Sequence, residues 1–105
     1  MSNRTAAPMG EDSEFFYALE RALKNCGSPA AVAGMLNRLR TIAHHGLGRM
    51  DPNDGPTIAR LVEEQIIAPD RSADRPHTYR LVGGTLLKNL LAQVSVSSSG
   101  KLYRA

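Results

Sequence analysis

The chain has 105 residues, which fits a single domain and excludes a second domain with a pocket of its own. Hydrophobic residues make up 42% of it and charged residues 22%, as in folded globular proteins rather than disordered ones. Its one cysteine, Cys26, excludes an internal disulfide, and no stretch approaches the roughly twenty apolar residues of a membrane span. Because residues 1–10 contain no apolar run of the signal-peptide kind, we expect a cytoplasmic protein with no membrane partner.

The net charge of +3 is distributed unevenly along the chain. Residues 11–20 contain four acidic residues and no basic one, whereas residues 71–105 contain six basic residues and one acidic residue. A basic segment of this kind favours a nucleic acid or an acidic protein as partner, and a solvated surface would show the same excess.

We expect residues 1–11 to form a flexible tail and residues 12–105 to form one domain. A first helix is predicted to begin at Asp12 or Ser13, because either side chain can cap free backbone N–H groups. Apolar residues then recur at helical spacing until Gly27, where the helix is expected to end.

A second helix is predicted to begin at Ser28 and Pro29. The serine hydroxyl can cap the helix, and proline suits the first helical position, where its missing N–H would be unpaired anyway. The apolar stripe continues to Gly46, the expected end of this helix. Residues 47–55 are polar and rich in glycine and are predicted to form a loop.

A third helix is predicted from Pro56 to about Gln65. The β-branched pair at 66–67 favours the start of a short strand, and a polar segment follows at 69–76. Alternating apolar and polar residues at 77–82 then predict a second strand.

The last third of the chain is predicted to add a helix and a hairpin. Gly83 and Gly84 interrupt the chain, and Thr85 can cap the short helix that follows. The tail at 94–103 has the pattern of a β-hairpin with its turn at Gly100. Four leucines share one face of the short helix and give a candidate surface for a protein partner or for homodimerisation: Leu86, Leu87, Leu90 and Leu91.

The stretch LVEEQIIAP at the end of the third helix, followed by a basic loop and HTYRLV, resembles winged-helix DNA-binding domains. The similarity covers residues 56–82, and the two earlier helices agree with it in number and order. It implies an α+β fold of winged-helix type, elaborated here by the C-terminal helix and hairpin, and a role in binding double-stranded DNA. A helix would enter the major groove while the basic loop reaches phosphates or the minor groove.

The resemblance also implies which side chains would touch DNA. Base edges would be contacted from the third helix by Thr57, Arg60 and Gln65. Phosphates would be contacted from the hairpin by Arg71, Arg75 and Arg80. Many winged helices have glycine where this chain has Gln65.

Two other interpretations remain open at the level of sequence. Residues 22–36 are similar to the opening of phage-repressor-like helix-turn-helix domains, although the helical stripe continues where a turn is expected. Alternatively, the domain is a protein-interaction module, such as a regulator, adaptor or inhibitor, that uses the leucine face or the basic face and does not bind DNA.

No motif predicts catalysis. The chain has no glycine-rich phosphate loop, nucleophile elbow or paired carboxylates, so we expect neither enzymatic activity nor a cofactor. His44 and His45 are adjacent, so their side chains leave a helix about 100° apart, which does not suit a shared metal ion. Cys26 lacks a partner base in its sequence neighbourhood and is interpreted as an inert, half-buried thiol.

Overall fold

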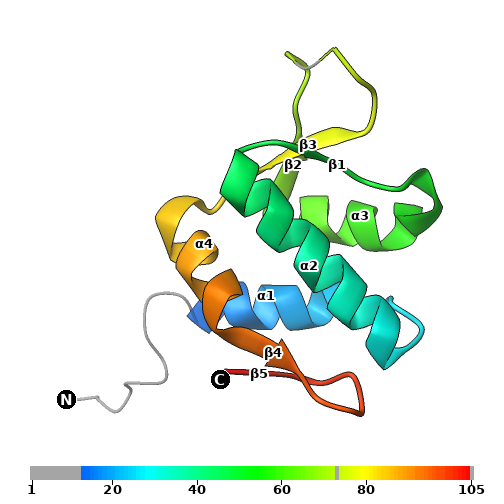
Figure 1. The fold of residues 1–105 in the computed structure, drawn as a ribbon, viewed down its shortest axis with the longest axis vertical. Coiled ribbons are helices and arrows are strands. Elements are labelled where there is room, and N and C mark those ends of the chain that lie inside the picture. Colours follow the sequence, from blue (N-terminus) through cyan, green and yellow to red (C-terminus); the bar gives the residue numbers. More distant parts are fainter. Residues whose placement is uncertain (1–12, 73, 105) are drawn as a thin grey trace.

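The computed structural model describes residues 13–72 and 74–104, which form an α+β fold with four α-helices and two small antiparallel sheets (Figure 1). The predicted tail at 1–11 and the alternative helix start at Asp12 lie outside the described residues. In chain order the elements are α1 (Ser13–Leu23), α2 (Pro29–His45), β1 (Gly48–Arg49), the 3₁₀-helix η3 (Pro52–Asp54), α3 (Gly55–Glu63), β2 (Ile67–Pro69), β3 (Thr78–Leu81), α4 (Gly84–Gln93), β4 (Val94–Val96) and β5 (Leu102–Arg104).

The predicted ends of α2 are confirmed. The Ser28 side chain accepts a hydrogen bond from the backbone N–H of Ala31 at 3.1 Å, and Pro29 is the first helical residue. At the other end Gly46 has φ 85°, and its N–H donates to the carbonyl of Ile42 at 2.8 Å. A residue with positive φ whose N–H donates a hydrogen bond to a carbonyl of the last turn ends a helix. Glycine adopts that conformation without steric cost.

The prediction of a loop at 47–55 is wrong, because this segment contains β1 and η3. The strand exists through a long-range contact: Gly48 lies opposite Tyr79 of β3, a pairing that local sequence cannot reveal. A β-carbon at Gly48 would lie 2.5 Å from Cγ1 of Ile42, so only glycine lets β1 approach α2 this closely. Asp51 then begins η3 by accepting a hydrogen bond from the N–H of Asn53 at 2.9 Å.

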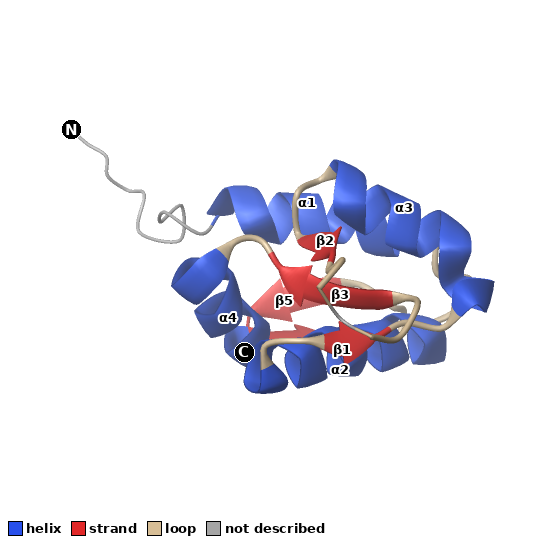
Figure 2. Cartoon of the chain, turned by 90° about the horizontal axis from the view of Figure 1, so that it is seen from above, coloured by secondary structure: helices blue, strands red, loops and turns tan. Residues whose placement is uncertain are grey.

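The larger sheet has the strand order β1–β3–β2, with both pairs antiparallel (Figure 2). The predicted hairpin is confirmed, since Ile67 of β2 lies opposite Leu81 of β3. In Figure 1 the described residues of this hairpin's loop, 70–72 and 74–77, project beyond the body of the molecule. We refer to this loop as the wing.

The C-terminal part follows the prediction except at the start of its helix. Thr85 lies inside α4. The capping position is occupied by Gly83, which has no side chain that could cap the helix. The prediction of a threonine cap is therefore wrong. The terminal hairpin is confirmed: β4 and β5 pair antiparallel, and Gly100 has φ 86° in the turn between them.

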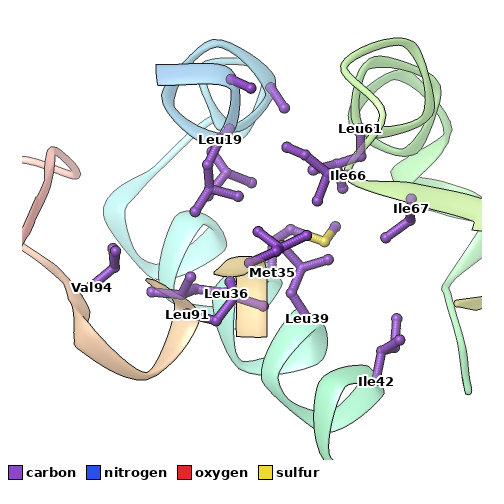
Figure 3. Close-up of a cluster of buried hydrophobic side chains, with 14 of the residues drawn as sticks. Leu19, Met35, Leu36, Leu39, Ile42, Leu61, Ile66, Ile67, Leu91 and Val94 are labelled. Carbon is purple, nitrogen blue, oxygen red and sulfur yellow. The ribbon is translucent and has the colours of Figure 1, made fainter. Parts of the chain in front are cut away.

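The core lies between the four α-helices and the inner face of the larger sheet (Figure 3). Its fully buried members come from all four α-helices, including Leu19 of α1, Leu39 of α2, Leu61 of α3 and Leu91 of α4. Because side chains of α4 are completely enclosed, the C-terminal helix is part of the same hydrophobic core as the rest. Within the described residues, no helix combines the length and apolar character needed to cross a membrane.

Arg40 of α2 holds the end of α4 in place. Its Nε donates to the carbonyl oxygen of Leu91 at 2.8 Å, and its Nη2 donates to the carbonyl oxygen of Val94. The carbonyls at a helix C-terminus lack partners within the helix and carry partial negative charge, so a guanidinium stabilises them. Arg40 is thus used inside the fold and does not contribute a free charge to the surface.

Candidate nucleic-acid interface

The outer face of the larger sheet carries two arginines side by side. Arg49 of β1 lies opposite Thr78 of β3, and Arg80 follows Thr78 by two residues on the same strand. Side chains directly opposite each other, and those two apart along a strand, share a face of a sheet, so Arg49, Thr78 and Arg80 lie on one face. The opposite face is the core face, because Ile67 is buried and Tyr79 packs against the core.

The wing is fastened to this arginine-bearing face by hydrogen bonds. The Thr78 hydroxyl donates to the carbonyl oxygen of Arg75 at 2.9 Å, and the N–H of Asp70 donates to the carbonyl oxygen of Thr78 at 2.9 Å. Thr78 is therefore buried under the returning loop, although the alternating pattern of the strand places it on the outer face. These bonds hold the backbone of Arg75 at the edge of the arginine-bearing face.

Arg71 and Arg75 of the wing are exposed, as are Arg49 and Arg80 of the sheet. In residues 13–72 and 74–104, ion pairs form at Arg21 and Arg60, and none forms at these four arginines. We call the four side chains the basic face. Their guanidinium groups are available to an external anion, which Arg21, Arg40 and Arg60 are not.

Thr57, expected to contact base edges, is placed in the interior. Its side chain is 5% exposed, and its hydroxyl lies 3.9 Å from the thiol of Cys26. A side chain buried at the start of α3 is not accessible to a base, so its position gives this expectation no support. Burial raises the pKa of the Cys26 thiol, which agrees with the interpretation of an inert, half-buried cysteine.

Arg60 is on the surface of α3 but is engaged by carboxylates. It lies 3.0 Å from Glu63 of its own helix and 3.0 Å from Glu64, the residue that caps the C-terminus of α3. Glu64 also accepts two hydrogen bonds from Arg21 of α1, at 2.8 and 2.9 Å, and these bonds lower the pKa of its carboxyl group. Two arginines and two glutamates leave this surface without net charge, so α3 offers a polyanion no electrostatic attraction.

Gln65, the third residue expected on the reading helix, lies just beyond its end. It has φ 62°, a left-handed conformation, and the N–H of Ile66 donates to the carbonyl oxygen of Leu61 at 2.9 Å. The N–H of Gln65 also donates to the carbonyl oxygen of Val62 at 3.0 Å, and these two hydrogen bonds together form a Schellman motif. The side chain is exposed at the base of the β2–β3 hairpin, away from the wing.

The leucine face expected to bind a partner belongs to the core. Leu87, Leu90 and Leu91 are completely buried, and Leu86 alone remains 40% exposed. The helix α4 is amphipathic, as predicted, and its apolar face packs against α2 and α1 of the same molecule. Three of the four leucines are therefore not accessible to a partner, and the structure gives no support to a protein interface or a homodimer formed through this face.

The histidine pair lies differently from the expectation. The rings of His44 and His45 pack edge to face with their centroids 4.8 Å apart, instead of pointing away from each other. In the part of the chain that the structure describes, no three His, Cys, Asp or Glu side chains are grouped as a metal ion would require.

Arg49 is the member of the basic face that sequence reasoning missed as a contact residue. It belongs to a two-residue strand more than twenty positions before the wing, and only the pairing of β1 with β3 brings it beside Arg80. Comparisons with protein-family models, curated proteins and solved structures give no match to this chain.

Proposed function

We propose that the protein binds double-stranded DNA through the phosphate backbone, with the basic face as the contact surface. The observation that carries the proposal is the register of the sheet, which puts Arg49 and Arg80 on one face beside the wing with Arg71 and Arg75. Exposed guanidinium groups without internal partners are suited to phosphates, because each can form two parallel hydrogen bonds to one anion.

The same structure favours weak dependence on base sequence. Base readout requires side chains on an element that enters a groove, and the expected reader α3 has Thr57 buried and Arg60 paired with glutamates. Contacts to phosphates set position and affinity but carry no sequence information of their own. We therefore propose binding of an architectural or accessory type, in which α3 serves as scaffold.

The test is a fluorescence-anisotropy titration of a mixed-sequence duplex at several salt concentrations. If all four arginines neutralise phosphates, the logarithm of the association constant should fall with the logarithm of salt concentration with a slope of about −3.6. Arg49→Gln should reduce the slope to about −2.7, because one phosphate contact is lost.

Arg38→Gln is the matched control. Arg38 is an exposed arginine of α2 that does not belong to the sheet or the wing, and its loss makes the same change in net charge. The proposal predicts that Arg38→Gln leaves the slope unchanged. Equal effects of the two variants, or no binding by the wild type below about 100 μM at low salt, would exclude the basic face as a DNA-binding surface.

A further inference from the structure

A groove of about 690 Å³ lies between α1 and the connection from β3 to α4. Its apolar lining comes from Phe15 and Tyr17 of α1 and from Val82, which directly follows β3. Tyr17 is 44% exposed and Val82 is 43% exposed, so two large apolar side chains from distant parts of the chain face solvent at one concave place. Concave apolar surface with polar groups at its margin is typical of binding sites for apolar anchors.

The margin of the groove carries one unbalanced negative charge. Glu14 and Glu64 line it together with Arg21, but the charge of Glu64 is already balanced by its ion pairs with Arg21 and Arg60. Among the described residues Glu14 forms no ion pair, so its carboxylate is available to a ligand. Glu14 lies in the first turn of α1, which forms one side of the groove.

The groove and the wing lie at opposite ends of the β2–β3 hairpin. At the base, the N–H of Val82 donates to the carbonyl oxygen of Ile66 at 2.9 Å. At the other end, the N–H of Asp70 donates to the carbonyl oxygen of Thr78. A ligand in the groove therefore leaves the basic face uncovered, and the acidic charge at the groove disfavours a nucleic acid there.

We propose that this groove is a docking site for a segment of a partner protein that carries an apolar side chain flanked by lysine or arginine. The apolar side chain would insert between Tyr17 and Val82, and a flanking cation would pair with Glu14. Tyrosine is enriched among the residues that dominate binding energy at interfaces, and opposite charges at the rim fix orientation. The proposal concerns a surface separate from the basic face and does not depend on DNA binding.

The test uses three short capped peptides added to the full ¹⁵N-labelled chain: KKLFKK, EELFEE and KKSSKK. In ¹H–¹⁵N spectra, KKLFKK is expected to shift the amide signals of residues 14–18 and 82–83, with saturation in the micromolar to millimolar range. EELFEE and KKSSKK are expected to shift them at least about fivefold more weakly, since each removes either the charge match or the apolar anchor.

Two pairs of variants separate the groove from general attraction to an acidic surface. Glu14→Lys should weaken KKLFKK binding at least about fivefold, whereas Glu20→Lys, the same reversal on α1 outside the groove, should weaken it less than twofold. Val82→Ser should weaken binding several-fold, whereas Leu86→Ser, a similarly exposed apolar residue of α4 outside the groove, should not. Circular dichroism melts establish that all four variants are folded.

Three results would overturn the proposal. The first is a KKLFKK footprint that is absent or lies outside the groove, and the second is equal loss of affinity in both members of either pair. The third is a shift of the groove signals with protein concentration alone, which would assign the groove to a second copy of the chain. A footprint at residues 14–18 and 82–83 that responds to Glu14→Lys and Val82→Ser alone would establish the site.

Discussion

Gln65 offers a sharp test of the local structure at the end of α3. The residue has φ 62° within a Schellman motif, and its neighbours Leu61 and Ile66 are fully buried against the core. The left-handed conformation costs a residue with a β-carbon about 1–2 kcal/mol, whereas glycine adopts it without that cost. Glycine also loses more backbone entropy on folding, which offsets about 0.5–1 kcal/mol of the gain.

Gln65→Gly should therefore stabilise the protein by about 0.5–1 kcal/mol. Gln65 is exposed, and within the described residues its side chain makes no hydrogen bond, so little is lost with it. For a chain of this size the gain corresponds to an increase in Tm of about 2–8 °C. The measurement is urea unfolding followed by circular dichroism, with a thermal melt as a second readout.

The control is Ala59→Gly on the same helix. Ala59 is exposed within α3, where glycine costs about 1 kcal/mol relative to alanine. The two glycine substitutions should thus shift stability in opposite directions. If Gln65→Gly destabilises the protein as much as Ala59→Gly does, residue 65 is not left-handed in solution and the Schellman motif is not the end of α3.

Three further predictions concern residues that hold the fold together. Arg40→Met should lower the free energy of unfolding by about 1.5–3 kcal/mol, because it leaves the last carbonyls of α4 without their charged donor, and Arg40→Lys should recover little of this in the same urea titration. Glu64→Gln should be less stable than the wild type at pH 7. Because the pKa of Glu64 is lower in the folded protein than in the unfolded chain, its carboxylate stabilises the fold at pH values above the unfolded-state pKa. Protonation removes this stabilisation, so the difference between the two proteins should shrink as the pH falls below about 4. Arg21→Gln should abolish most of that pH-dependent difference. Gly48→Ala should cost about 1–3 kcal/mol in thermal or urea unfolding, since its β-carbon would overlap the core, whereas Gly27→Ala, where nothing lies within 4 Å, should be nearly neutral.

The elements with local signals could be predicted from the sequence. Ser28 and Pro29 start α2, Gly46 ends it, and Gly100 turns the last hairpin, because capping and turn formation depend on residues adjacent in the chain. The start of α4 shows the limit of such signals. Thr85 is a good capping residue, but the chain places Gly83 at the cap, where a β-carbon would lie 2.7 Å from Cβ of Leu87.

The parts that escaped prediction depend on contacts between distant segments. The strand β1 consists of Gly48 and Arg49 and exists only because β3 pairs with it. Thr57 has an ordinary polar side chain, and its burial follows from the way the start of α3 packs near Cys26 of the α1–α2 connection. The pairing of Arg21 with Glu64 spans 43 positions. Periodicity identifies an amphipathic helix but not which neighbour its face will cover.

The arginines show why a charge count along the chain misplaces a binding surface. In the sequence they are equivalent, and the excess of basic residues after position 70 suggests a surface in the C-terminal half of the chain. In the structure Arg21 and Arg60 form ion pairs with glutamates, and Arg40 donates hydrogen bonds to carbonyl oxygens at the end of α4. Arg49 lies outside the basic segment and yet sits beside Arg80, because both strands belong to one sheet. The surface available to an anion is thus set by which guanidinium groups lack an internal partner, and that depends on packing.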